Sequence, residues 1–224
     1  SPDFSEAEVN PVTYNGSANI YQEVDEDTGA RIITISEINS DVALEFTSYC
    51  LWVTGTYNIT STADNTLLLY LKSYPNQTIC KRMKVDGLET EAANFYRFSS
   101  TGEHTVKFVF PDKTSIPESA FYLNENLISL NIPEGVMTLN PYSIYNCKAL
   151  SSVSLPQSLT YGNYDGLSRN TSLRSIILPD NLVVANNFMR GCSSLESVQL
   201  PKNLKTIPSN MFSGCSSLKQ LTIP

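Results

Sequence analysis

The sequence predicts a mixed, mostly β protein in which an antiparallel β-sandwich is followed by a repeat solenoid. Three observations support this fold class: a recurring phrase in the second half, short alternating apolar segments in the first half, and a change of charge between the halves. We expect a flexible leader over residues 1–19, a β-sandwich domain over residues 20–110 and a repeat domain over residues 111–224.

The repeat half consists of one phrase written five times. Each copy reads Leu-x-x-apolar-x-apolar-Pro, and successive copies lie 22 or 23 residues apart. One unit of this length cannot bury its apolar side alone, whereas stacked units bury it against their neighbours. The phrase therefore predicts a solenoid of about five 23-residue coils, whose leading leucines are Leu127, Leu150, Leu173, Leu195 and Leu218.

The residues between the fixed apolar positions of each phrase should point outward, because neighbours on a strand face opposite sides. Stacked in parallel strands, they would form one sheet face of small uncharged side chains. We expect this face to contact a binding partner, with Tyr161 and Tyr164 as aromatic anchors. Its expected members are Ser129, Asn131, Ser152, Ser154, Ser175, Ile177, Ser197, Gln199, Gln220 and Thr222.

The third repeat departs from the pattern. Gly162 stands where the other repeats carry Ile, Leu or Val, and Tyr161, Tyr164 and Asp165 crowd the same turn. Two interpretations remain open. Either the coil is locally distorted and displays an aromatic patch, or the tyrosines fill the space of the missing side chain.

The front half contains short segments rich in β-branched and aromatic residues, separated by turn formers such as Asp86-Gly87. These segments predict an antiparallel, immunoglobulin-like sandwich of roughly 90 residues. The expected strands cover residues 31–36, 42–46, 51–54, 66–71, 95–98 and 104–110.

Charge separates the two halves. Residues 1–110 carry 7 Lys and Arg against 15 Asp and Glu, whereas residues 111–224 carry 8 against 7. The contrast suggests a domain boundary near residue 110. No basic stripe is present to neutralise phosphates, which argues against a nucleic-acid partner. No apolar run approaches the roughly 20 residues of a transmembrane helix.

Five cysteines are present, and their positions suggest two roles. Cys147, Cys192 and Cys215 each precede a repeat leucine by three residues, where the other repeats carry Asn124 and Asn170. We interpret them as small buried groups that fill one column of the solenoid. Cys50 and Cys80 would pair if the chain matures in an oxidising compartment, and this remains open. No spacing suits a zinc site.

The sequence contains no recognisable catalytic or cofactor motif, so we expect no enzyme activity, cofactor or metal. His104 is the only histidine, so any catalytic triad must include it, yet it lies in an alternating strand. Asp25 to Gly29 opens like a calcium loop, but the twelfth position is Ser36 where a glutamate is needed. Trp52 is interpreted as a core residue or, alternatively, as a sugar-stacking platform.

The stretch from Ile207 to Pro224 reads Ile-Pro-x-x-x-Phe-x-x-Cys-x-x-Leu-x-x-Leu-x-Ile-Pro. It resembles the BspA-type leucine-rich repeats of surface proteins from Bacteroides-like bacteria, and the front half is similar in kind to the β-sandwich modules that precede such repeats. The resemblance implies a leucine-rich-repeat solenoid in a secreted or cell-surface protein. Such proteins face the exterior of the outer membrane and are often lipid-anchored, which implies an anchor before Ser1. The family brings no catalytic residues.

Three functions follow from these expectations. The first is a non-enzymatic binding protein of the cell exterior, whose solenoid engages a protein or extracellular-matrix partner. The second is a carbohydrate-binding accessory module in which Trp52 contacts glycan and the repeats act as a spacer. The third is an architectural spacer that assembles end to end through the coil at Pro224. The sequence leaves the oligomeric state open.

Overall fold

The computed structural model describes residues 19–24, 31–36, 51–70 and 79–222. The chain divides into two compact units, Ser1–Cys50 and Leu51–Pro224. In the first unit, β1 (Asn19–Val24) and β2 (Arg31–Ser36) pair antiparallel. The expected strand at 42–46 and the loop from Asp25 to Gly29 lie outside the described residues.

The charge contrast follows this division more closely than the expected one. The first 50 residues carry 1 Lys or Arg against 10 Asp and Glu, whereas residues 51–224 carry 14 against 12. The acidic residues are concentrated in the first unit, and residues 51–110 resemble the repeats in charge. The boundary expected at residue 110 lies inside the second unit.

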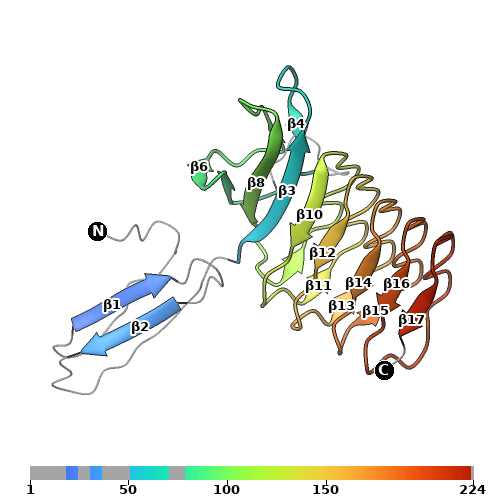
Figure 1. Ribbon diagram of the computed structural model, residues 1–224. Coiled ribbons are helices and arrows are strands. Elements are labelled where there is room, and N and C mark those ends of the chain that lie inside the picture. The colour runs from blue at the N-terminus through green and yellow to red at the C-terminus, as the bar shows by residue number, and fades with distance from the viewer. Residues whose placement is uncertain (1–18, 25–30, 37–50, 71–78, 223–224) are drawn as a thin grey trace. The chain divides into compact units, whose positions relative to one another are not determined.

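Each of the first four coils contributes a phrase strand and a short opposing strand, and the fifth contributes a phrase strand (Figure 1). We number the coils by residues 114–133, 137–156, 160–179, 182–201 and 205–222. The phrase strands are β10 (Leu127–Asn131), β12 (Ser152–Ser154), β14 (Ser175–Ile177), β16 (Ser197–Gln199) and β17 (Gln220–Thr222). The opposing strands are β9 (Ser115–Ile116), β11 (Thr138–Leu139), β13 (Tyr161–Gly162) and β15 (Val183–Val184). The opposing strands form one parallel sheet, and the phrase strands pair in parallel as β10 with β12 and as β14 with β16 and β17. The described residues contain no helix, and the expected solenoid of about five coils is confirmed.

A turn precedes the phrase strand of every coil, and each turn places two residues four positions apart at positive φ. Backbone hydrogen bonds connect successive turns, as from Ile144 N to Gly166 O (2.9 Å) and from Gly191 N to Ser213 O (2.8 Å). The polar backbone of the turns is thus paired between coils. The left-handed residues are Ser119, Leu123, Tyr142, Asn146, Asp165, Arg169, Asn187, Gly191, Asn210 and Gly214.

The remaining strands of the second unit cap the first coil. They are β3 (Val53–Ile59), β4 (Thr66–Leu67), β5 (Arg82–Val85), β6 (Leu88–Thr90), β7 (Phe95–Tyr96) and β8 (Gly102–Val109). One sheet has the order β12-β10-β3-β8-β5-β6, and the expected strands at 66–71, 95–98 and 104–110 correspond to β4, β7 and β8. The segment expected at 51–54 overlaps the start of β3.

Strand β3 lies between β8 and the first phrase strand, β10. It pairs antiparallel with β8 on one side and with β10 on the other, so β8 and β10 run parallel to each other. Pro111, directly after β8 and Phe110, precedes Pro133 by 22 residues, the repeat spacing. A strand from earlier in the chain is therefore inserted into the repeat sheet.

The cap and the first coil share one core. Phe108 of β8 packs edge-on against Phe121 of the first coil, with ring centroids 5.7 Å apart, and both rings are fully buried. The Asn124 side chain donates a hydrogen bond to Leu68 O (2.8 Å) in the cap. Residues 51–110 are thus continuous with the solenoid, and a complete immunoglobulin-like sandwich over 20–110 stays a prediction.

The column of cysteines and asparagines is buried as expected, and it also donates hydrogen bonds. Cys147 Sγ donates to Phe121 O (2.8 Å), Asn170 Nδ2 to Ile144 O (2.9 Å), and Cys192 Sγ to Leu167 O (3.2 Å). Each donor satisfies a turn carbonyl of the preceding coil. Burial raises the pKa of the Cys147 and Cys192 thiols to about 12. Cys80 is a buried free thiol, and Cys50 lies outside the described residues.

The third coil is not distorted, and its tyrosines do not fill the gap at Gly162. Strand β13 stays in register with β11 and β15. A Cβ at Gly162 would lie 2.5 Å from Phe188 Cε2, and one at Gly166 3.0 Å from the same atom. The fully buried Phe188 of the fourth coil fills the space instead. The compensating side chain therefore comes from the next coil, and neither a distorted coil nor filling by the tyrosines accounts for the gap. The displayed aromatic residues of the first interpretation are present, because Tyr161 and Tyr164 are exposed.

Candidate interaction surfaces

The expected sheet-face residues are brought together in columns. Parallel register aligns Ser129 with Ser152 and Asn131 with Ser154 in the first two coils. The same register aligns Ser175, Ser197 and Gln220, and likewise Ile177, Gln199 and Thr222, in the last three coils. Ser129 and Ser197 are half-buried, and the other eight are exposed. We call these ten residues the sheet face.

The sheet face is divided between the second and third coils, and it is extended by β3 at the edge of the first coil. β12 and β14 belong to separate sheets, and next to this break Val153 and Leu155 are half-buried where their counterparts in the first, third and fourth coils are buried. At the other edge, β3 aligns Thr54 with Asn131 and Thr56 with Ser129. The polar surface of the first coils thus continues onto the cap.

The two expected anchors lie elsewhere. Tyr161 belongs to β13, in the sheet opposite the sheet face, and Tyr164 lies in the following turn. Their side chains are 41% and 42% exposed. They are therefore accessible, but they do not flank Ser152 or Gln199.

Tyr164 instead belongs to a row of packed tyrosines along the turn side of the first three coils. Tyr70, Tyr122 and Tyr145 stack in sequence, with ring centroids 5.2 and 5.1 Å apart. Tyr142 packs edge-on against Tyr145 at 5.4 Å and against Tyr164 at 5.2 Å. We call these five residues the tyrosine row. The sequence separates its members by as many as 94 positions, from Tyr70 to Tyr164, so only the fold brings them together.

Arg169 of the third coil packs against the tyrosine row at Tyr145. The Arg169 guanidinium carbon lies 5.8 Å from the centroid of the Tyr145 ring, a cation–π geometry. Burial raises the pKa of Tyr145, while Arg169 and Arg190 lower it. Burial and then Asp165 raise the pKa of Tyr142. Its hydroxyl therefore stays protonated at neutral pH and can donate hydrogen bonds.

Trp52 is neither a fully buried core residue nor an open platform. It is half-buried, with the Arg82 guanidinium carbon 5.3 Å and Lys84 Nζ 5.6 Å from its ring centroid. Arg82 also pairs with Glu89. Cationic groups thus occupy the space near the ring where a sugar would stack.

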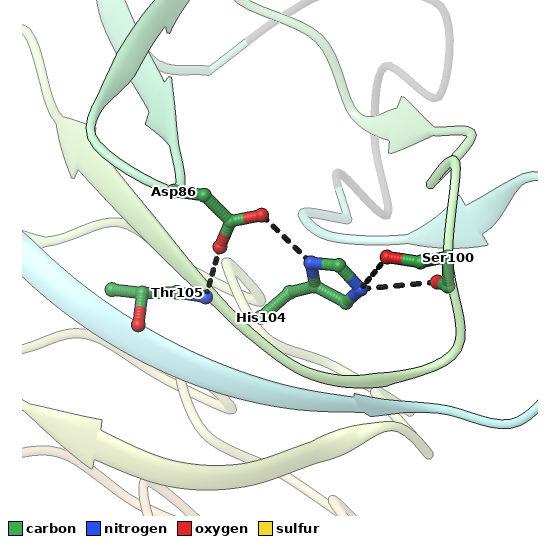
Figure 2. Close-up of polar contacts among 4 residues, drawn as sticks. All are labelled: Asp86, Ser100, His104 and Thr105. Atoms are coloured by element: carbon green, nitrogen blue, oxygen red, sulfur yellow. Dashed lines mark hydrogen bonds and ion pairs between the residues drawn. The ribbon is translucent and has the colours of Figure 1, made fainter.

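The only histidine takes part in a polar cluster with the composition of a catalytic triad (Figure 2). His104 Nδ1 lies 2.7 Å from Asp86 Oδ2, and Nε2 lies 3.3 Å from Ser100 Oγ. However, Nε2 lies closer, at 3.0 Å, to the Ser100 carbonyl oxygen, which can only accept. That carbonyl competes with Ser100 Oγ for Nε2, so the arrangement lacks the dedicated serine–histidine hydrogen bond of a catalytic triad.

The same cluster has a clear structural role. Asp86 begins the tight turn between β5 and β6 at a φ of 50°, and Gly87 follows at 84°. The Asp86 carboxylate also accepts a hydrogen bond from Thr105 N (2.9 Å). His104 and Asp86 therefore tie this turn to β8, as expected for a histidine in an alternating strand.

Two searches of the described residues were negative. No group of three or more His, Cys, Asp or Glu side chains there has the arrangement of a metal site. Within the same ranges, no helix has the length and apolar character needed to cross a membrane.

Solved structures of other repeat proteins show partial similarity to the chain. A leucine-rich cell surface protein from Faecalibacterium prausnitzii is 25% identical over 51% of this chain and 31% of its own, with a TM-score of 0.46. The pneumococcal vaccine antigen PcpA is 28% identical over 49% of this chain and 27% of its own, with a TM-score of 0.47. The chain thus spans about a third or less of these proteins. No curated protein matches it.

A family model matches more than half of the chain. The BspA-type leucine-rich repeat region aligns with residues 96–224 in six copies. Six copies are one more than the five phrases, and the matched range begins before β8, whose following Pro111 keeps the repeat spacing. The matched range therefore includes β8, the strand that pairs with β3. The chain belongs to the BspA-type leucine-rich repeat proteins.

Proposed function

We propose that this protein is a non-enzymatic binding protein of the cell surface or the secreted fraction, and that its solenoid engages a protein or extracellular-matrix partner through the sheet face. The observation that carries the proposal is the in-register columns of small uncharged side chains. Serine, asparagine, glutamine and threonine offer hydrogen bonds at little steric cost, and the strands beneath hold them in fixed positions.

The location at the cell exterior follows from the repeat type. BspA-type repeats are typical of surface proteins, and this chain carries such repeats. Attachment to an outer membrane through a lipid anchor belongs to the same proposal. Labelling intact cells with a membrane-impermeant biotin reagent tests it, because an interior protein would remain unlabelled until lysis.

The contact surface is tested with a binding array and a charge variant. The full chain is applied to an array of purified extracellular-matrix and serum proteins, and hits are measured again with Ser152, Ser154, Gln199 and Gln220 replaced by glutamate. Four carboxylates on this face should abolish binding, because they would be buried without partners. All four positions are exposed, so the substitutions should leave the fold intact.

A matched control places four carboxylates elsewhere, at the exposed residues Thr60, Ser99, Thr206 and Ser209. This variant should bind like the natural sequence. Equal binding by both variants would remove the sheet face as the contact surface. A parallel glycan array with Trp52→Ala addresses the carbohydrate alternative, which requires saccharide binding that this substitution abolishes.

A further inference from the structure

The tyrosine row occupies a different side of the solenoid from the sheet face and contains the residue types that dominate protein interfaces. Tyrosine and arginine are the side chains most enriched among the residues that determine binding energy. Here Arg169 lies over the ring of Tyr145, and its backbone N donates a hydrogen bond to Arg190 O (2.7 Å), which places Arg190 in the adjacent turn. Both arginines are exposed.

The residues around the tyrosine row adopt a backbone conformation that does not suit them. Leu123, Tyr142 and Arg169 have φ values of 58°, 55° and 60°. For most side chains this left-handed conformation costs conformational energy, whereas glycine and asparagine adopt it readily. The fourth and fifth coils carry Gly191 and Gly214 at the position of Leu123 and Arg169.

These three residues gain little from burial in return. Leu123 is 40% exposed, Arg169 is exposed and Tyr142 is half-buried. Strain at bulky, accessible residues is a reason to look for function, because the fold alone is satisfied by smaller residues at the same positions. The strained side chains and the tyrosine row occur in the same three coils.

The arrangement of the rings favours a protein over a glycan. Sugars stack on open aromatic faces, but the faces of Tyr122 and Tyr145 are covered by neighbouring rings and by Arg169. Tyr164 is exposed and the other four tyrosines are half-buried, so ring edges rather than open faces are accessible. The turns of this region also carry the acidic residues Glu118 and Asp165, but the end of the row at the third and fourth coils has two exposed arginines, which suit a surface that supplies carboxylates and carbonyls.

We propose that the tyrosine row, with Arg169 and Arg190, is a second interaction surface that binds an acidic surface of a protein partner. Carboxylates of the partner meet the two arginines, and its main chain accepts hydrogen bonds from the tyrosine hydroxyls. This surface does not depend on the sheet face, so each can be tested without the other.

The test uses the full chain and a display library of random dodecapeptides as the probe. Selected peptides should be enriched in Asp and Glu, and their binding should weaken in high salt. The double variant Arg169→Gln and Arg190→Gln should bind them at least about tenfold more weakly, and Tyr164→Ser should also weaken binding. The matched control is Arg174→Gln, an exposed arginine that pairs with Glu196 away from the tyrosine row.

Three results would overturn the proposal: no enriched peptides, peptides without acidic bias, or equal binding by the double variant. Saccharide binding that is lost on Tyr164→Ser would assign the surface to glycan and overturn it as well. Thermal melts of each variant exclude unfolding as the cause of lost binding. The variant with four glutamates on the sheet face should still bind the selected peptides. A failure of the proposed function can therefore be distinguished from a failure of this second surface.

Discussion

The turn side of the first three coils differs from that of the last two, although the backbone of the turns is the same. Every turn places two residues at positive φ, four positions apart. In the fourth and fifth coils these are Asn187, Gly191, Asn210 and Gly214, which tolerate that conformation. In the first three coils the six positions include a leucine, a tyrosine and an arginine.

The difference separates what the fold requires from what the surface displays. Buried donors such as Cys192 and Asn170 and the bonds between successive turns occur in both regions. These features hold the coils together wherever they occur, so the exposed side of a turn is free to change. Bulky residues persist there only in the coils that carry the tyrosine row, which is where we expect selection for binding.

The largest effect is expected where the two regions meet, at Phe188. This ring of the fourth coil fills the space above Gly162 and Gly166 of the third. Phe188→Ala should lower the free energy of unfolding by about 3–5 kcal/mol, because it leaves a cavity in a fully buried position. Guanidinium denaturation followed by circular dichroism measures the loss.

A second substitution tests whether Gly162 and Phe188 act as a pair. Gly162→Leu alone should cost about 1–3 kcal/mol by overpacking against the ring. Combined with Phe188→Ala it sets a leucine of one coil against a small residue of the next, as Leu139 and Gly166 are by position, and the double variant should lose less than the sum of the single losses. Additive losses would contradict the pairing.

The pair also shows what the sequence could and could not predict about the fold. The period of the leucines was sufficient for the coils, because each coil buries the same positions against its neighbours. The third repeat alone could not predict which side chain fills the space at Gly162. That side chain is Phe188 of the fourth coil, and the equivalent position carries the small residues Ala120, Ser143 and Gly166 in the preceding coils. The inserted strand β3 was also missed, because pairing between distant segments leaves no period in the sequence.

The next largest effect is expected in the buried column shared by both regions. Asn170 donates to Ile144 O and Leu167 O and accepts from Cys147 N. Asn170→Ala should cost about 2–3 kcal/mol, because it leaves buried backbone groups without partners. Asn170→Cys, which recreates the donor of the second, fourth and fifth coils, should cost less. Equal melting temperatures for the two variants would show that the column only fills space.

The candidate surfaces were predictable to different extents. The columns of the sheet face follow directly from strand alternation, and the register places Ser152 and Gln220 as that rule requires. The tyrosine row was missed apart from Tyr164. Tyr122 and Tyr145 are 23 residues apart, a signal that could have been read, but Tyr70 comes from the cap and only tertiary packing brings it onto Tyr122.

A smaller, pH-dependent effect on the free energy of unfolding is expected at the loops that follow the first and second coils. Glu134 accepts hydrogen bonds from Gln157 N (2.8 Å) and Ser158 N (3.0 Å), and the bond from Gln157 N is the main cause of its lowered pKa. Glu134→Gln should cost about 0.5–1 kcal/mol at neutral pH, since the carboxylate is exposed and screened by solvent.

The sign of the pH dependence follows from the lowered pKa. The stabilisation is complete above the ordinary glutamate value of 4.5 and is lost as the pH falls through the lower value of the folded state. The gap in unfolding free energy between the natural chain and Glu134→Gln should therefore close in acid. Gln157→Ala, at the equivalent uncharged position of the second coil, should show a loss that does not vary with pH. A constant gap for Glu134→Gln would contradict the role of the charged form.

The smallest effect tests the comparison most directly, because it exchanges the residue types of the two regions. Leu123→Gly should raise the free energy of unfolding by about 0.5–1 kcal/mol, since removal of the left-handed strain outweighs the added freedom of the unfolded chain. Gly214→Ala, at the same position of the fifth coil with a φ of 80°, should lower it by about 1 kcal/mol. If Leu123→Gly stabilises the chain and weakens peptide binding, the leucine is retained at the expense of stability. If it destabilises the chain, Leu123 is part of the packing of the first coil and the strain has no bearing on binding.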